Sequence, residues 1–285
     1  MEDTQQPTKT VVSLDSQWFN GIQNCPAKLN YQLIQHLQPT VKAAPLERGD
    51  LLHVIMDAYY KGRMNNIKHE MNLKQAIEHG RLHTATLDLP TEEIESVIKF
   101  TTESLNYHKD DGWVPVAVEQ PFSYLLYSSP TLDIISTGVI DLIVDIKGVG
   151  LTVVDHKSSS RASTPSPLSN QFMNYCYGTN TVRALVNQIG FQKTVPAEQK
   201  YRRVVLSYSQ GILDEWKKDT IFWIKFALNL INNDYFPKNL TSCDKYGGCI
   251  FQQICLTLPE AREWKIGVNF VKGEPWDPYT KGKTN

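Results

Sequence analysis

The stretch GVIDLIVDIKGVGLTVVDHK, residues 138–157, decides the fold of this chain. It predicts two β-strands rich in Val and Ile, joined by a glycine-containing turn at residues 147–150. Core strands usually exclude charge, yet this hairpin carries Asp141, Asp155 and Lys157. Side chains alternate along a strand, so Asp155 and Lys157 share one face. Burying such charges is costly unless they are paired or bind a metal, and the hairpin therefore indicates a hard-cation site.

The composition is that of a globular protein. At 285 residues, with 41% hydrophobic and 21% charged residues, the chain is long enough for one large domain or two small ones. A formal net charge of −1 excludes a wholly basic nucleic-acid binder but allows a local basic groove. We find no apolar run of roughly 18 residues that would predict a membrane helix, and the polar start MEDTQQPTKT does not resemble a secretion signal. Five cysteines, an odd number, fit a reducing compartment. We expect a soluble, cytoplasmic protein.

The hydrophobic pattern around the hairpin predicts a mixed α/β (α+β) fold. Helices and strands alternate along the chain, which is typical of a central sheet flanked by helices. The periodicity predicts helices at 49–63, 170–177 and 213–232, and strands at 114–127 and 202–209.

We expect a single domain over residues 16–265. It comprises a helical insert at about 50–110, a catalytic core at about 113–210, and a C-terminal helix with a cysteine-containing segment at about 211–256. Residues 1–15 are expected to form a flexible lead-in, and residues 266–285 a polar tail.

Four side chains outside the hairpin are candidates for the same site. His53 lies beside the apolar face of its predicted helix, where a histidine is more often a satisfied, partly buried group than a ligand. Glu119 lies in a strand-like run and is either a solvated strand residue or a group that points towards the charged site. Gln171 and Tyr175 are four residues apart, so they share one face of a helix.

Three cysteines lie within thirteen residues near the C-terminal end, with five residues in each gap: Cys243, Cys249 and Cys255. This density is hard to explain by packing, and it favours ligation of a metal or cluster that needs a fourth thiolate. Cys25, directly before Pro26, is the natural fourth, because Cys176 lies inside a predicted helix. Taken alone, Cys25 is more simply a small buried group.

These residues resemble the signature of the PD-(D/E)xK nuclease superfamily. Asp141 with Asp155-His156-Lys157 resembles the D…(D/E)xK motif, Gln171-x-x-x-Tyr175 is similar to the QxxxY motif of the RecB-like branch, and Gly49-x-x-x-His53 matches its upstream histidine. The four cysteines resemble the iron–sulfur variety found in CRISPR-adaptation exonucleases, the AddB subunit of a recombination helicase–nuclease, and phage exonucleases. The resemblance covers about residues 18–256. The cysteine spacing departs from the CxxC pair common in the family, and the second acid is Asp where many members carry Glu.

The resemblance implies a restriction-endonuclease-like core sheet and a metal-dependent DNA nuclease. Among DNA nucleases it favours an exonuclease. His53, Asp141, Asp155 and the backbone carbonyl of His156 would bind Mg²⁺ or Mn²⁺. Lys157 would position the attacking water and offset developing negative charge. Further roles fall to three side chains: Gln171 and Tyr175 would orient DNA phosphate or the surroundings of the lysine, and Glu119 would contact the ligands.

The resemblance also implies a [4Fe–4S] cluster, with zinc the less favoured occupant, that staples the two ends of the chain through Cys25, Cys243, Cys249 and Cys255. The implied substrate is DNA, single-stranded or as an end-bearing duplex. The sequence contains no GxxxxGK[ST] helicase motif, so the nuclease would act alone or with a helicase, recombination or CRISPR-adaptation partner. The processes that use such nucleases are recombination, DNA repair, CRISPR adaptation and phage DNA processing, the last in the host cytoplasm.

Two alternatives stay open at this point. A catalytically inactive DNA-binding or scaffolding protein would keep the fold but lose part of the catalytic set, which is complete here. A zinc-stabilised structural module would leave the charges of the hairpin exposed and would bind no divalent cation at them. Titration with Mn²⁺, compared between the natural protein and Asp141→Ala, separates both from the nuclease.

Overall fold

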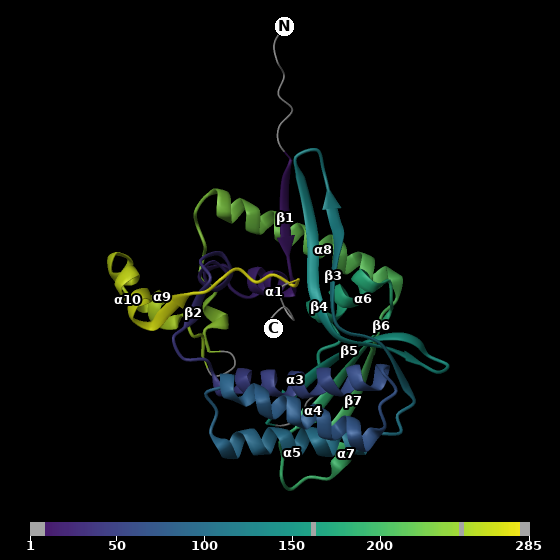
Figure 1. Ribbon diagram of the computed structural model, residues 1–285. Helices are drawn as coiled ribbons and strands as arrows, with labels where there is room; N and C mark the ends of the chain where they lie inside the picture. Colours follow the sequence, from purple (N-terminus) through teal and green to yellow (C-terminus); the bar gives the residue numbers. More distant parts are fainter. Residues whose placement is uncertain (1–8, 161–163, 245–247, 280–285) are drawn as a thin grey trace. The chain divides into compact units, whose positions relative to one another are not determined.

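The computed structural model describes residues 9–160, 164–244 and 248–279. It divides into two compact units, which we name by their content. The sheet unit comprises residues 42–122 and 139–210, and the cysteine unit comprises residues 1–41, 123–138 and 211–285. Strands β3 (Trp113–Ser128) and β4 (Leu132–Ile146), which pair with each other, contribute residues to both (Figure 1). The single domain predicted over residues 16–265 includes parts of both units.

The sheet unit is built on a mixed sheet whose centre is the predicted hairpin. The end of β4 pairs antiparallel with β5 (Gly150–Ser159), β5 pairs parallel with β6 (Arg183–Gly190), and β6 pairs antiparallel with β7 (Tyr201–Ser207). The hairpin turn contains Gly148 and Gly150, both with positive φ, a conformation that glycine adopts without steric cost. The prediction of a mixed α/β fold with helices flanking the sheet is confirmed.

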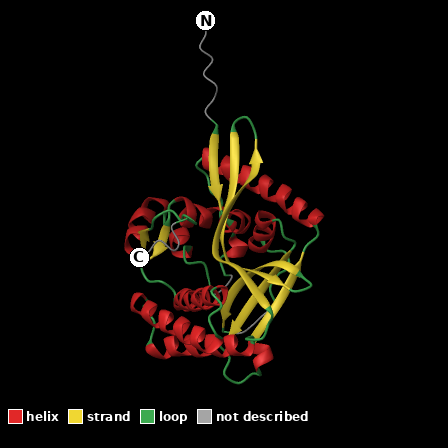
Figure 2. Ribbon diagram, turned by 45° about the vertical axis from the view of Figure 1, so that its right-hand side comes forward, coloured by secondary structure: helices red, strands yellow, loops and turns green. Residues whose placement is uncertain are grey.

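Helices cover one face of this sheet (Figure 2). They are α3 (Ala44–Met64), α4 (His69–His83) and α5 (Thr91–Tyr107), with a 3₁₀ turn at Thr84–Thr86 after α4. Leu51 and Ile55 of α3 belong to one buried cluster with Val154 of β5 and Leu185 of β6. Since side chains alternate along β5, burying Val154 under these helices turns Asp155 to the opposite face. Helix α6 (Asn170–Thr179) follows β5, and the short α7 (Ala197–Lys200) precedes β7.

The cysteine unit is mainly helical. Its helices are α1 (Ser16–Asn24), α2 (Pro26–Leu29), α8 (Gln210–Asn232), α9 (Gln252–Leu256) and α10 (Arg262–Asn269). A π-helical turn lies at Asn30–Ile34, and 3₁₀ turns lie at Leu240–Ser242 and Pro259–Ala261. Helix α1 begins where the Asp15 carboxylate accepts hydrogen bonds from the backbone of Gln17 and Trp18, which satisfies amides that have no partner within the helix.

The flexible lead-in predicted for residues 1–15 is wrong from residue 10 onwards. Strand β1 (Thr10–Leu14) pairs parallel with β4, with Thr10 opposite Leu132. The segment TVVSL is rich in β-branched residues, which favour the extended conformation of a strand. Residues 1–8 lie outside the described part of the chain.

The polar tail predicted for residues 266–285 is wrong for its first part. Helix α10 continues to Asn269, and β8 (Phe270–Lys272) pairs antiparallel with β2 (Leu37–Pro39). Phe270 is buried and stacks on Phe251, with ring centroids 5.1 Å apart. The β2–β8 ribbon therefore joins the two ends of the chain within the cysteine unit. Residues 280–285 are not described.

Candidate active site

An ion pair on β5 forms the centre of the candidate site. Asp155 is buried, at 1% exposure, and its Oδ2 lies 2.9 Å from Lys157 Nζ. The two residues share one face of the strand, as the alternation predicts. The Lys157 side chain is 46% exposed, so its ammonium group reaches solvent while it pairs with the buried carboxylate. The pair therefore consists of a buried carboxylate and a lysine whose side chain is partly exposed to solvent.

The second acid of the hairpin lies next to this pair. The backbone N–H of His156 donates a hydrogen bond to Asp141 Oδ2 at 2.8 Å, which fixes the carboxylate of β4 against β5. The pairing of Leu142 with Val154 sets the register that makes this contact possible. The predicted role of the His156 backbone carbonyl as a metal ligand stays a prediction.

The helix after the hairpin supplies the pair predicted from its spacing. Gln171 Nε2 on α6 donates to Asp155 Oδ1 at 3.0 Å and to the phenol oxygen of Tyr175 at 2.9 Å. Tyr175 is buried, with its ring edge-on to Phe122 at 5.8 Å. The sequence predicted that these residues orient DNA phosphate or the surroundings of the lysine. In the structure they hold the carboxylate of Asp155, which is the partner of that lysine.

A group of possible metal ligands adjoins the ion pair. His53 on α3, Glu119 on β3 and Asp141 on β4 each offer one donor atom, and these atoms all lie within 4.8 Å of one another. His53 Nδ1 lies 3.4 Å from Asp141 Oδ2. One imidazole with two carboxylates suits a divalent cation such as Mn²⁺ or Mg²⁺, so the residues present fit the metal that the resemblance implies.

Glu119 has a larger part in this group than its sequence context predicted. Its φ of 47° places it in the left-handed region, which non-glycine residues rarely occupy within a strand. The irregular backbone turns the carboxylate towards His53 and Asp141 instead of leaving it in the regular alternation of β3. Asp155 is outside the group in this structure, and its carboxylate instead contacts Lys157 and Gln171. Its predicted role as a ligand stays a prediction.

Burial and charge shift the pKa values of the site in different directions. Burial raises the pKa of Asp155 to about 6, against the opposing attraction of Lys157 and with a further rise from Asp141. Burial alone would lower the pKa of Lys157, but the carboxylate of Asp155 raises it overall, so the lysine stays cationic. Burial also raises the pKa of Tyr175, so its phenol stays protonated. Asp155 thus has a pKa close to neutral pH and lies beside the ammonium group of Lys157. A carboxyl group of this kind is suited to bind a metal cation when one is present.

The opposite face of the sheet supports the site through His156. Its imidazole stacks on Tyr60 of α3, with centroids 5.5 Å apart and planes 11° apart, and its Nδ1 lies 2.9 Å from Asn187 Nδ2 on β6. Burial lowers the pKa of His156 well below its usual value, so the ring is neutral and can accept this hydrogen bond. The two contacts fix the peptide that donates to Asp141.

The support continues away from the site. Arg203 Nε donates to Asn187 Oδ1 at 3.4 Å, and Arg203 Nη2 donates to Asp111 Oδ2 at 2.9 Å. Asp111 also pairs with Arg63 at 3.0 Å. Sequence reasoning missed this network, although one signal was available: Asn187 interrupts the apolar run of β6 (RALVNQIG) just as the charges interrupt the hairpin.

The predicted cysteine ligands line one cavity of the cysteine unit. Cys25, Cys243, Cys249 and Cys255 surround a space of about 270 Å³, beside Lys238 and the aromatic ring of Phe251. The backbone N–H of Asn239 points at Cys25 Sγ, 3.4 Å away. Burial raises the pKa of Cys255, and nearby Lys238 opposes that rise. Cys176 is buried in α6 and does not line this cavity, and burial raises its pKa to about 12.

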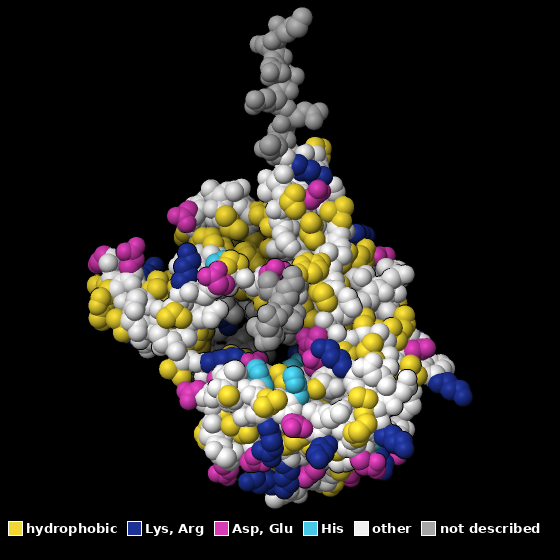
Figure 3. All heavy atoms as spheres, in the orientation of Figure 1, with side chains coloured by type: hydrophobic (Ala, Val, Ile, Leu, Met, Phe, Trp, Pro, Cys, Tyr) yellow, Lys and Arg dark blue, Asp and Glu magenta, His cyan; other side chains and the backbone are white. Residues whose placement is uncertain are grey.

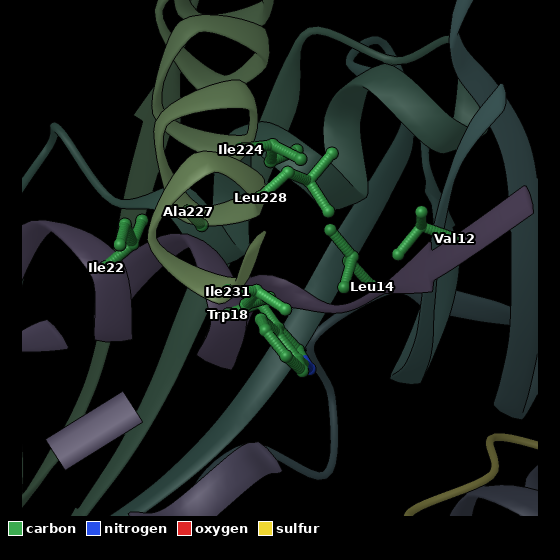
Figure 4. A pocket seen from close by; sticks show the side chains of 8 residues that line it. All are labelled: Val12, Leu14, Trp18, Ile22, Ile224, Ala227, Leu228 and Ile231. Carbon is green, nitrogen blue, oxygen red and sulfur yellow. The ribbon is translucent and has the colours of Figure 1, made fainter. Parts of the chain in front are cut away.

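A second cavity of the cysteine unit carries no chemistry. Figure 4 shows it lined by apolar side chains of β1, α1 and α8, at a volume of about 40 Å³. Val12 and Leu14 of β1 face Ile224 and Leu228 of α8 across it. It is a gap in the packing between these elements.

The face of the molecule drawn in Figure 3 agrees with the prediction that the chain is not a wholly basic nucleic-acid binder. On the face drawn in Figure 3, acidic and basic side chains are interspersed and no broad basic field covers it. No helix in the described ranges is long and apolar enough to cross a membrane.

The comparison with protein families decides the affiliation. The family model of the PD-(D/E)XK nuclease superfamily matches residues 19–256. The chain belongs to this superfamily. The match includes all the site residues discussed above and the four cysteines of the cavity, and it supports a nuclease. Among curated proteins, none matches the chain.

Solved structures resemble this nuclease at low sequence identity. A candidate exonuclease from Eubacterium rectale is 13% identical, with a TM-score of 0.49, over 96% of this chain and 94% of its own. SSO0001 is 13% identical, with a TM-score of 0.40, over 86% of each chain. LHK-Exo, solved with dAMP, is 9% identical, with a TM-score of 0.34, over 65% of this chain and 95% of its own.

Proposed function

We propose that this member of the superfamily is a divalent-metal-dependent DNA exonuclease. The observation that carries the proposal is the convergence of two groups: the ligand set of His53, Glu119 and Asp141, and the Asp155–Lys157 pair. Mg²⁺ or Mn²⁺ would be held by the ligand set, with Asp155 joining it. When bound, the cation supplies Lewis-acid chemistry towards phosphate and water.

The chain's own residues divide the remaining work. Lys157 presents an ammonium group on the open side of Asp155, where it can hydrogen-bond the attacking water and offset the charge that develops on phosphate. Gln171 holds Asp155 in place through its amide, and Tyr175 holds Gln171. His53 and Asp141 are fixed by α3 and β4, so the geometry is set by regular elements. The water is thus positioned before reaction.

One set of variants tests the proposal. Lys157→Gln and Asp141→Asn should each abolish Mn²⁺-dependent cleavage of end-labelled linear DNA, while thermal unfolding stays cooperative. Asp145→Asn is the matched control, since Asp145 lies on the same strand as Asp141 but is exposed and outside the ligand group. A natural protein that cleaves neither linear nor circular DNA with Mn²⁺, alone or with a helicase, overturns the proposal in favour of a DNA-binding or scaffolding protein. Cleavage of circular DNA at the rate of linear DNA overturns only the exonuclease assignment.

We further propose that the cysteine cavity holds a [4Fe–4S] cluster. Four thiols line one space, yet within the described chain no three cysteine sulfurs lie within 4.8 Å of one another. A single zinc ion with bonds of about 2.3 Å needs sulfurs about 3.8 Å apart. The wider spread and the size of the cavity, about 270 Å³, favour a polynuclear cluster over one ion.

The two occupants differ in colour and composition. Anaerobically purified protein should be brown and contain about four iron and four sulfide per chain. A colourless protein with one zinc per chain overturns the cluster assignment and leaves the nuclease assignment untouched, because the catalytic ligands contain no cysteine.

A further inference from the structure

Two neighbouring arginines on β7 have opposite surroundings. Arg203 is committed to the support network, where its guanidinium pairs with Asp111 at 2.9 Å and lies 3.5 Å above the centre of the Trp113 ring. Arg202 is half-buried, and no residue in the described ranges forms a hydrogen bond or ion pair with it. Because side chains alternate along a strand, Arg202 points to the face opposite Arg203. That is the face of Asp155 and Lys157.

The strand register places Arg202 in line with the catalytic lysine. Lys157 on β5 pairs with Gln188 on β6, and Gln188 pairs with Arg202 on β7. Paired residues of adjacent strands carry their side chains on the same face, about 4.8 Å apart per strand. Lys157, Gln188 and Arg202 therefore form a row across the site face, with the two cationic positions about 10 Å apart at their Cα atoms.

The middle of this row holds a buried polar atom without a partner. Gln188 is 6% exposed, and its Oε1 has no hydrogen-bond partner within the described structure. A buried carbonyl oxygen without a donor is costly, and its presence calls for an explanation. Its neighbours on either side are long cationic side chains, which carry donors only.

We propose that Arg202 binds a DNA phosphate next to the one at the metal site and that Gln188 Oε1 holds the bound guanidinium in the row. This inference rests on the proposed nuclease function and adds a substrate contact to it. A half-buried guanidinium that has no carboxylate partner among the described residues can bind phosphate with two parallel hydrogen bonds. Its five donors allow one to be given to Gln188 while two engage the phosphate.

The row also explains why Arg202 and Arg203 follow each other. Arg203 holds His156 from behind the sheet through Asn187, whereas Arg202 faces the substrate. Strand β7 thus contributes to both faces of the sheet. Of its two consecutive arginines, Arg203 supports the site and Arg202 binds the substrate.

Arg202→Gln tests the contact. It should raise KM for single-stranded DNA about tenfold with kcat within about twofold. The slope of log KM against log salt should fall by about 0.7, the contribution of one phosphate contact on a single strand. Arg81→Gln is the matched control, because it removes the same charge from an exposed ion pair of the same unit and should change neither quantity. Arg202→Lys keeps the charge and should retain the salt slope while losing part of the affinity.

Gln188→Leu tests the second half of the proposal. It should raise KM about threefold in the natural background. It should have no further effect in Arg202→Gln, because Gln188 acts on the phosphate contact only by holding the guanidinium of Arg202. Equal KM and salt slope for Arg202→Gln and Arg81→Gln would overturn the inference, as would loss of kcat alone. If the natural protein cleaves no DNA, the proposed function has failed. A natural protein that cleaves DNA while Arg202→Gln is unchanged leaves that function standing and removes only this contact.

Discussion

The catalytic site and the cysteine cavity are built on different principles. In the sheet unit the polar groups already touch: Lys157 and Gln171 contact Asp155, and His156 contacts Asp141. In the cysteine unit Cys25 and the three C-terminal cysteines surround an open space of about 270 Å³. The first site is held by strand register and one helix, whereas the second is formed by residues from loops and short helices.

This difference separates a site that exists before its ligand from one that the ligand completes. Register and alternation place charges on a strand face whether or not a cation is bound. Thiols spread around a cavity have no such restraint, and the group they bind supplies the order. We therefore expect the sheet unit to stay folded when its divalent cation is removed. Removal of the cluster should destabilise the cysteine unit.

Among the further substitutions that test this comparison, replacement of Asp155 should have the largest effect. Asp155→Asn should lower cleavage by at least about a thousandfold, since the position loses its charge next to the metal. In the metal-free protein the same change should raise the free energy of unfolding at pH 7 by up to about 3 kcal/mol, because the pKa of Asp155 is raised from 3.8 to about 6. Lys157 loses its partner but reaches solvent.

The sign of the pH dependence follows from the raised pKa. A carboxyl whose pKa is higher in the folded state contributes stability below about pH 4, and that contribution is lost as the pH rises through about 6. With a chelator present, the natural protein should lose stability relative to Asp155→Asn between these values in urea unfolding. Cleavage with Mn²⁺ present should also rise with pH as the carboxylate forms. If Asp155→Asn is less stable than the natural protein at pH 7, the buried charge of Asp155 does not destabilise the metal-free fold.

Removing a cysteine ligand tests the other half of the comparison. Cys249→Ala should eliminate bound iron and sulfide and lower the free energy of unfolding by several kcal/mol. Cys176→Ala is the control, because Cys176 is buried in α6 and does not line the cavity, so its loss should leave the iron content unchanged. The affinity for Mn²⁺ should change less than about twofold in both. A large drop in Mn²⁺ affinity in Cys249→Ala would show that the two regions are coupled.

A smaller effect is expected behind the sheet. Asn187→Ala removes the hydrogen bond to the His156 ring and should weaken Mn²⁺ binding about tenfold to a hundredfold, as loss of outer contacts does in other metal sites. Calorimetric titration measures this affinity. Asn72→Ala removes a buried asparagine that bonds Tyr59 in the same unit, so it should cost similar stability and leave the affinity unchanged. Equal affinities in both variants would make Asn187 a structural residue only.

The smallest effect is expected at Tyr175. Tyr175→Phe removes the oxygen that accepts from Gln171 but keeps the ring against Phe122. One hydrogen bond of this kind corresponds to about threefold to tenfold in cleavage rate. A loss above about a hundredfold in kcat would mean that the phenol touches the substrate directly.

Much of the sheet unit could be predicted because its information is local. The hairpin at 138–157 specifies its own strands, and alternation assigns Asp155 and Lys157 to one face. The i, i+4 spacing of Gln171 and Tyr175 likewise predicted a shared helix face, and the structure adds which oxygen they hold. Nothing in the sequence gives the side-chain conformations that direct Gln171 to Asp155.

The missed features depend on partners that are distant in the chain. Strand β1 becomes a strand because β4 pairs with it, and β8 because β2 does. Asn187 acquires meaning only beside His156, which the register of two parallel strands brings opposite it. From its sequence context Glu119 is either a solvated strand residue or a site residue. Its left-handed backbone, which no periodicity reveals, turns it towards the site.

The conformation of Glu119 has a consequence for laboratory evolution. A left-handed glutamate costs roughly 1 kcal/mol relative to glycine, which adopts the same backbone freely. A library at position 119 selected for heat resistance should therefore enrich Gly and Asn, whereas the same library selected for DNA cleavage should return Glu. Opposite winners under the two selections would identify a residue that is retained for its chemistry at the expense of the fold.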